Sequence, residues 1–318
     1  VALAAPTQGI YRPDWTAANR AEAPVMLPRV APYLDGMELV DQIDVADVES
    51  EQAHDYQWRN DRAAGSFPTE YYEFGYLNCA ADCLVMDGGR RINGEESFAL
   101  TTTPEQSLIL VTRLHPADVG TFDVYANDQL IATRVIPSLP GSWYEVPTLI
   151  PAALVMAETR IRIVPHVTGD YMPYQHWSYQ GDYQPPALEH EPIATFQDGA
   201  IQLVDAGVSV IEGRSVALSQ VWRTEGGAQG DYKIFAHVLN TDGQIVAQMD
   251  DRPGDGNLPP GNWIAGTIRD TMEIALPDSA QSQYRVELGL YDPVTGMRLT
   301  VNSVLAATED SLFLGAFR

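Results

Sequence analysis

Two closely spaced cysteines are the first candidates for chemistry in the sequence. Cys79 and Cys83 stand in the segment Asn78-Cys-Ala-Ala-Asp-Cys83. Structural zinc takes four Cys or His ligands, and no histidine lies nearby in sequence, so a metal site is disfavoured. A redox-active pair is more often spaced Cys-x-x-Cys. The pair therefore predicts a small structural disulfide, which would indicate an oxidising compartment outside the cytoplasm.

A glycine-rich acidic loop is a candidate calcium site. It places four oxygen-bearing side chains within eight residues: Asp250, Asp251, Asp255 and Asn257. Calcium takes six to eight oxygen ligands, often from such loops. Arg252 and Pro253 interrupt the run, and the spacing is not that of an EF-hand. The alternative is a solvated acidic loop without a metal, so calcium is the one cofactor that the sequence suggests.

Six ring-bearing residues form a candidate carbohydrate-binding cluster: Tyr171, Tyr174, His176, Trp177, Tyr179 and Tyr183. Exposed aromatic faces make dispersion contacts with flat apolar surfaces, such as the C–H face of a sugar. The alternative is that the rings cap a β-sandwich or pack between two domains. A second cluster, Tyr71, Tyr72, Phe74 and Tyr76, lies beside the cysteines and favours packing or a subunit contact, because tyrosine is enriched at interfaces.

Evidence for catalysis is weak. Glycoside hydrolysis needs two carboxylates about 5–10 Å apart in a cleft, and the neighbouring pairs Glu95–Glu96 and Asp250–Asp251 are expected to be solvated. The sequence contains neither a Gly-x-Ser-x-Gly elbow nor a His-Glu-x-x-His zinc motif. His237 lies in an apolar stretch, where it is expected to be a satisfied core or rim residue.

Composition limits the classes of partner. The chain has 318 residues, with 19 Lys and Arg against 43 Asp and Glu, and a formal net charge of −24. Nucleic acids and anionic membrane surfaces are bound by basic patches, so neither is an expected partner. No segment approaches the about 20 apolar residues of a membrane span. The start Val1-Ala-Leu-Ala-Ala-Pro6 resembles the neighbourhood of a signal-peptide cut, which with the acidity predicts a secreted or cell-surface protein. A salt-rich habitat would explain the acidity equally well.

The elements that must position these residues are predicted to be strands. In the first half, 107–113 is a continuous apolar run, 121–126 and 129–135 alternate around the turn Asn127-Asp128, and 159–164 alternates with its arginines outward. Residues 44–56 are compatible with a short helix or a surface excursion, and 151–156 with one helical turn. Strands at this spacing predict a sandwich or jelly roll over 36–183.

The second half repeats this character after a stiff Pro-rich linker, residues 184–192. Seven strands are predicted, at 200–204, 216–222, 232–239, 245–249, 267–276, 284–291 and 311–317. Asn240-Thr-Asp-Gly243 and Asp292-Pro-Val-Thr-Gly296 are turns between them. Residues 193–318 therefore form a second antiparallel sandwich. The fold class is all-β, with two jelly-roll-like or immunoglobulin-like sandwiches.

Residues 1–35 lack periodicity and are punctuated by five prolines. They predict an extended N-terminal arm with no core of its own, which would dock either on its own chain or on another subunit.

Several segments carry a resemblance to a known family. In the second domain they are 231–239, 242–250, 289–299 and 310–315, and in the first 87–91, 95–98, 141–145 and 150–154. Together they resemble the extracytoplasmic jelly-roll and β-sandwich region found C-terminal in some bacterial multi-pass membrane glycosyltransferases and related surface proteins. The resemblance covers about residues 36–318 and implies the fold. The transferase part is absent from this sequence, so no catalytic residue is carried over.

These observations predict a non-catalytic, secreted cell-surface structural protein that assembles with itself into a filament or coat. The arm would add to the open sheet edge of a neighbouring subunit, and head-to-tail contacts of this kind polymerise when the rotation does not close. A carbohydrate-binding module of the cell envelope, with polysaccharide as partner, is the second hypothesis. A glycoside hydrolase is the third.

Overall fold

The computed structural model describes residues 31–61, 70–76, 84–116, 118–137, 144–185, 190–211, 214–254, 256, 258–277 and 283–317. The side chains of 31–32, 70–87 and 316–317 are not among those described. Predictions on Cys79, Cys83, Asp255, Asn257, the second aromatic cluster and most of the arm therefore lie outside the described residues. The chain divides into two compact units, Val1–Gln184 and Pro185–Arg318, called unit 1 and unit 2 below.

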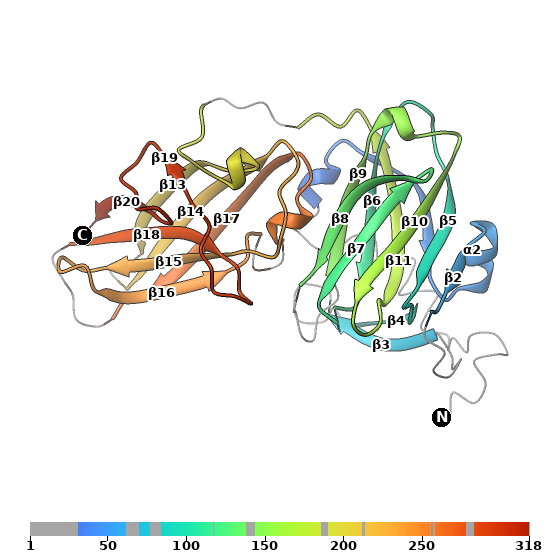
Figure 1. The fold of residues 1–318 in the computed structure, drawn as a ribbon, viewed down its shortest axis with the longest axis horizontal. Coiled ribbons are helices and arrows are strands. Elements are labelled where there is room, and N and C mark those ends of the chain that lie inside the picture. The colour runs from blue at the N-terminus through green and yellow to red at the C-terminus, as the bar shows by residue number, and fades with distance from the viewer. Residues whose placement is uncertain are drawn as a thin grey trace. The chain divides into compact units, whose positions relative to one another are not determined.

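Unit 1 is an antiparallel β-sandwich with a few short helical turns (Figure 1). Its elements are η1 (Ala31–Leu34), β1 (Glu38–Asp44), α2 (Val48–Ala53), β2 (Gln57–Arg59), β3 (Glu70–Tyr76), β4 (Leu84–Arg90), β5 (Glu95–Thr101), β6 (Ser107–Leu114), β7 (Gly120–Ala126), β8 (Gln129–Ile136), β9 (Tyr144–Ile150), η2 (Ala152–Leu154), β10 (Glu158–Val167) and β11 (Pro173–Gly181). One sheet has the order β1-β11-β6-β9, the other β2-β5-β10-β7-β8, and β3 pairs with β4.

The core of unit 1 lies between its two sheets. Alternate residues of β5, β7 and β10 point inward, as the fully buried Phe98, Phe122 and Ile161 show. On the facing sheet, β6 is buried along nearly its whole length, as its continuous apolar run predicts. Burial of one large apolar side chain contributes about 1.5–3 kcal/mol, so this interface dominates the stability of unit 1.

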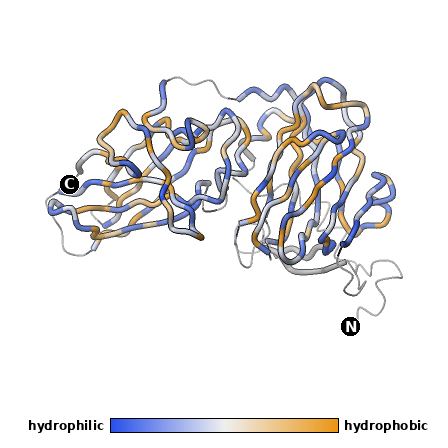
Figure 2. The backbone as a smooth tube through the Cα atoms, viewed as in Figure 1, coloured by the Kyte–Doolittle hydropathy of each residue, from blue (hydrophilic) through white to orange (hydrophobic). Residues whose placement is uncertain are grey.

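Unit 2 is a second antiparallel sandwich. Its elements are β12 (Ala194–Phe196), η3 (Gln197–Gly199), β13 (Ile201–Ile211), β14 (Ser215–Thr224), β15 (Lys233–Leu239), β16 (Ile245–Asp251), η4 (Pro260–Asn262), β17 (Gly266–Ala275), β18 (Tyr284–Tyr291), β19 (Asn302–Ser303) and β20 (Leu312–Phe317). Its sheets have the orders β17-β14-β13-β12-β19 and β16-β15-β18-β20. The prediction of an all-β chain of sandwiches is confirmed, and Figure 2 shows the alternation of hydrophobic and hydrophilic residues along many strands.

The aromatic segment after β10 is the main correction to the predicted elements. Pro173–Gly181 is the strand β11, which lies inside its sheet with β1 on one side and β6 on the other. No strand is predicted from the sequence at these residues, which include Gln175, His176, Ser178 and Gln180. The strand is nevertheless buried on both faces.

Candidate functional site

The predicted carbohydrate-binding cluster is wrong for four of its six residues, because they are buried. Tyr171, Tyr174 and His176 are 0% exposed, and Trp177 is 1% exposed. Their rings contact the protein and offer no free face to a sugar. Tyr179 and Tyr183 are partly exposed, and partial burial raises the pKa of the Tyr183 hydroxyl to about 12. Two separate tyrosines do not form the aromatic platform that the sequence suggested.

A buried carboxylate organises the polar interior of unit 1. Glu96 of β5 is 0% exposed and accepts hydrogen bonds from two tyrosines. The Tyr56 hydroxyl lies 2.5 Å from Oε2, and the Tyr171 hydroxyl lies 2.9 Å from Oε1. Burial and the negative charge of Glu96 raise the pKa of both tyrosines well above the ordinary value, so both hydroxyls remain donors.

His176 completes this group of side chains, the Glu96 cluster. Its Nε2 lies 3.4 Å from Glu96 Oε1, and its Nδ1 lies 3.0 Å from the hydroxyl oxygen of Thr112. The ring packs against Phe98 with a centroid separation of 4.5 Å. A glutamate, a histidine and two tyrosines are suitable types for acid–base chemistry. With Glu96 and His176 fully buried, however, the cluster links β5 to β11 and exposes no reactive atom to a substrate.

The sequence prediction of a solvated Glu95–Glu96 pair is half wrong. Glu95 is 35% exposed, near Arg59 and Arg162, whereas Glu96 points inward. The pattern Glu96-x-Phe98-x-Leu100 contained the clue, because alternate residues of a strand share one face. Glu96 therefore had to share the core face with Phe98.

A second buried ion pair lies on the opposite face of the four-stranded sheet. Arg113 of β6 donates to Glu145 Oε1 of β9 from Nε at 3.1 Å and from its second terminal nitrogen at 2.6 Å. Both side chains are 0% exposed. The guanidinium carbon lies 4.6 Å from the centroid of the Trp177 ring. This pair joins two neighbouring strands, and the Trp177 ring packs against its guanidinium.

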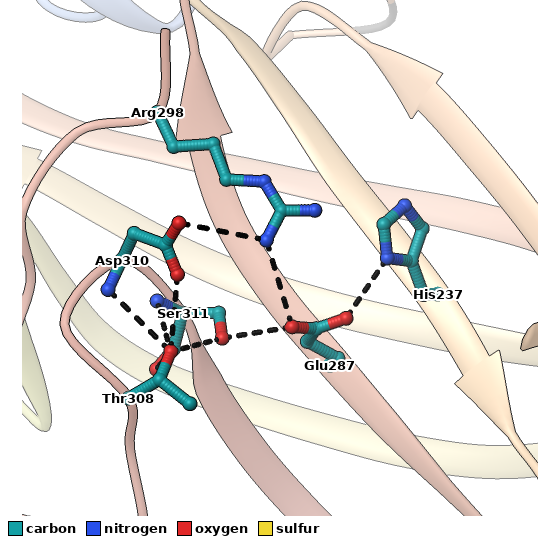
Figure 3. Close-up of polar contacts among 6 residues, drawn as sticks. All are labelled: His237, Glu287, Arg298, Thr308, Asp310 and Ser311. Atoms are coloured by element: carbon teal, nitrogen blue, oxygen red, sulfur yellow. Dashed lines mark hydrogen bonds and ion pairs between the residues drawn. The ribbon is translucent and has the colours of Figure 1, made fainter. Parts of the chain in front are cut away.

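Unit 2 has a comparable polar network on one face of its four-stranded sheet, the Glu287 cluster (Figure 3). Glu287 of β18 accepts from Ser311 Oγ at 2.9 Å, and its other oxygen lies 2.9 Å from His237 Nδ1. Arg298 lies 3.7 Å from both Glu287 and Asp310. His237 is 7% exposed, which confirms the expectation that it is a satisfied rim residue.

The order of groups in the Glu287 cluster does not match an activated serine. A nucleophilic serine is hydrogen-bonded to a histidine, which an acid orients in turn. Here the carboxylate stands between Ser311 and His237, and Ser311 is 0% exposed. The Thr308 hydroxyl oxygen lies 2.7 Å from Ser311 Oγ, so both hydroxyls are used internally. The arrangement fixes the 298–311 segment to the sheet.

Of the four predicted calcium ligands, the structure describes Asp250 and Asp251. Asp250 accepts a hydrogen bond from the Tyr291 hydroxyl at 3.3 Å, and Asp251 Oδ1 accepts from the Arg252 N–H at 2.8 Å. Arg252 also forms a two-pronged pair with Asp231, at 2.6 and 2.8 Å. Among the residues that the structure describes, no group of three His, Cys, Asp or Glu side chains is placed to hold a metal.

No protein-family model matches the sequence, and no curated protein matches it. Solved structures that it resembles include Bacteroides uniformis β-glucuronidase, at 13% identity and a TM-score of 0.24, covering 66% of this chain and 26% of that one. A calcium-binding mutant of Bacteroides uniformis β-glucuronidase 2 is similar at 12% identity and a TM-score of 0.25, covering 84% of this chain and 32% of that one. A glycosyl hydrolase family 2 member from Bacteroides cellulosilyticus is similar at 12% identity and a TM-score of 0.24, covering 81% of this chain and 36% of that one.

The chain spans about a quarter to a third of the length of these structures. At TM-scores this low, the likeness carries no conclusion about activity. In the described part of the chain, no helix is both long enough and apolar enough to cross a membrane.

Proposed function

We propose that the chain is a non-catalytic structural protein of the cell surface that associates with copies of itself. One observation supports the non-catalytic part: three carboxylates in the polar networks of the described residues serve as cross-links between strands. Glu96 and Glu145 are buried and bound to groups on other strands, and Glu287 is 15% exposed and bound in the same way. Satisfied polar networks stiffen a core and specify one packing.

The last part of the predicted arm packs on its own unit. Tyr33 in η1 is 3% exposed and lies near Arg134 of β8. Burial lowers the pKa of Arg134 to about 10, and Tyr33 opposes that shift. Tyr33 therefore serves as an anchor between the described end of the arm and unit 1.

The edge strand β1 follows directly after this anchor. Within the described strands it pairs only with β11, and its Leu39 and Val40 are 46% and 39% exposed. An exposed sheet edge is a template for strand addition by a second chain. The N–H groups of Gln42 and Asp44 already bind side-chain oxygens of Asp41 and Ser50, so strand addition would use the part of β1 that carries Leu39 and Val40. This edge is the supported acceptor for the arm of a neighbouring copy.

Electron microscopy and light scattering of the full chain test this proposal. We expect regular polymers from the full chain and folded monomers from a variant that lacks residues 1–30. Polymers that persist without the arm would contradict arm exchange, and a full chain that stays monomeric would contradict self-association.

A panel of chromogenic glycosides tests the non-catalytic part. We expect no hydrolysis by the wild type. Hydrolysis that Glu96→Gln or Glu287→Gln abolishes, in a variant that remains folded, would show that the cross-links are catalytic.

A further inference from the structure

A hollow of about 490 Å³ lies on unit 2, and none of its lining residues belongs to the Glu287 cluster. Its polar lining comes from two segments far apart in sequence: Thr195, Gln197 and Asp198 on one side, and Thr300 and Asn302 on the other, with the apolar Leu299 beside them. The volume falls within the range of about 300–1,000 Å³ that is typical of small-ligand clefts.

The wall of the hollow that carries Asp198 has an unusual backbone. Three consecutive residues have positive φ: Gln197 at 49°, Asp198 at 54° and Gly199 at 96°. A residue other than glycine in the left-handed region costs on the order of 1 kcal/mol or more, and such residues gather at ligand sites and turns. The chain holds two such residues in succession at the edge of this hollow.

Side-chain contacts keep this strained turn in place. The Gln197 amide donates to the Gln229 carbonyl at 2.9 Å and accepts from the Gln229 N–H at 3.1 Å. Gln202 Nε2 donates to the Gly199 carbonyl at 3.1 Å. These contacts hold the backbone of the turn, and Asp198 is exposed at its tip.

The opposite wall is set by strand register. Asn302 of β19 pairs with Thr195 of β12, so the two side chains lie on one face of the sheet as neighbours. The hollow therefore combines a carboxylate acceptor, an amide that both donates and accepts, and two hydroxyls. Vicinal hydroxyl groups of a sugar fit such a set, and Leu299 offers an apolar surface to its C–H groups.

From this hollow we infer a binding site for neutral glycans, with Asp198, Thr195, Thr300 and Asn302 as the hydrogen-bonding residues. The net charge of −24 and the Asp198 carboxylate select against acidic polysaccharides. The inference does not depend on self-association. It places glycan binding on residues of unit 2 and not on the aromatic residues of β11.

Affinity electrophoresis of the full chain tests the site. Gels contain xylan, galactomannan, mixed-linkage β-glucan or dextran, and polygalacturonate serves as the acidic probe. We expect retardation by at least one neutral polysaccharide and none by polygalacturonate. Asp198→Gly removes the carboxylate and suits the positive φ, and a lost hydrogen bond to a charged group should weaken binding about tenfold. Asn302→Ala should weaken it as well.

Asp242→Ala is the matched control. Asp242 is exposed in the Asn240–Gly243 turn, which borders a different hollow of unit 2, and the substitution changes the net charge by the same amount as Asp198→Gly. It should leave retardation unchanged. No retardation by any neutral polysaccharide, equal retardation of Asp198→Gly and wild type, or a loss confined to Asp242→Ala would each overturn the site. Circular dichroism of the variants separates loss of binding from unfolding.

Discussion

At the scale of single residues, Asp41 and His54 form a clasp between elements of unit 1. His54 follows α2, and its Nε2 lies 3.0 Å from Asp41 Oδ1 on β1. Its Nδ1 lies 2.6 Å from the Ser50 carbonyl oxygen. Both ring nitrogens face acceptor oxygens, so the geometry favours the cationic ring, in which both nitrogens are donors. The other carboxylate oxygen accepts the Thr101 N–H of β5 at 2.7 Å.

The clasp predicts a defined pH dependence. The hydrogen bond to Asp41 raises the pKa of His54 above 6.5. Burial acts to raise the pKa of Asp41, but the His54 and Thr101 hydrogen bonds outweigh it and hold that pKa below 3.8. The contribution of His54 is therefore complete below pH 6.5 and is lost as the pH rises through its raised pKa. The contribution of Asp41 to stability is present above pH 3.8 and is lost as the pH falls through its lowered pKa.

We expect His54→Gln to lower the free energy of unfolding by about 1 kcal/mol near pH 5.5 and by much less near pH 9. Urea unfolding at both pH values measures the difference. His190→Gln is the control, because His190 is exposed, and it should have no effect at either pH. A loss of stability in His54→Gln that is equal at both pH values would contradict a cationic clasp.

Substitutions at the adjacent residues Glu96 and Glu95 should change the free energy of unfolding by very different amounts. Glu96→Ala leaves the buried hydroxyls of Tyr56 and Tyr171 without their acceptor, so we expect a loss of about 3–5 kcal/mol. Tyr171→Phe removes one of these hydrogen bonds and should cost about 1–2 kcal/mol. Glu95→Gln alters a partly exposed ion pair and should cost less than about 1 kcal/mol. Equal losses at 95 and 96, measured by urea unfolding, would mean that Glu96 is not the internal cross-link.

At the scale of elements, the β7–β8 hairpin tests whether turn chemistry sets strand register. Asn127 and Asp128 have φ values of 47° and 65°, the two left-handed residues of a type I′ turn. Asp128→Gly should stabilise unit 1 by about 0.5 kcal/mol, whereas Asp128→Val should destabilise it by more than about 1 kcal/mol. Thermal unfolding ranks the variants, and a valine variant as stable as the wild type would contradict the turn assignment.

Asn127 also ties this hairpin to its surroundings. Its side chain donates to the Leu154 carbonyl at 2.8 Å and accepts the Arg160 N–H at 3.0 Å. The sequence predicted the turn from Asn127-Asp128 and the flanking alternation, because both signals are local. It could not predict these two contacts, which depend on η2 and β10 arriving beside the turn.

The same division between local and non-local information explains which elements were predictable. The strands of unit 2 from β13 to β18, and β20, follow apolar alternation and were predicted, with differences at their ends. The short strands β12 and β19 were not, since two or three residues show no period and their pairing joins Thr195 to Asn302 across the sequence. Strand β11 was missed because its polar residues hide the apolar alternation, and contacts such as those of His176 with Thr112 and of Gln180 with Thr103 come from distant parts of the sequence.

Candidate sites were less predictable than strands for the same reason. The clustering of Tyr171 and Trp177 was visible in sequence, but their burial depends on packing against other strands. The hollow at Asp198 showed no sequence motif, because its residues come from segments about 100 positions apart and its wall depends on backbone conformation. The alternation of β5 does predict that Glu96 points inward. It identifies a core residue, however, and not a residue of a ligand-binding site.

At the scale of the whole molecule, charge opposes the proposed self-association. Copies with a net charge of −24 repel one another, and salt screens this repulsion because the Debye length falls from about 30 Å at 0.01 M to about 3 Å at 1 M ionic strength. If the contact between copies is strand addition with apolar side chains such as Leu39 and Val40, its own attraction depends little on salt. Association should then strengthen as salt rises.

Light scattering of the full chain in about 0.02 M and about 0.5 M sodium chloride measures this balance. We expect the mean mass to rise with salt for the full chain and to stay at the monomer value for the variant lacking residues 1–30.

Leu39→Lys places a charge on the exposed edge of β1, where lysine blocks strand addition, and it should suppress association at both concentrations. Val119→Lys is the control, since Val119 is 51% exposed outside β1. Association that weakens with salt would instead indicate attraction between opposite charges, and equal suppression by the two lysine variants would remove the β1 edge from the contact.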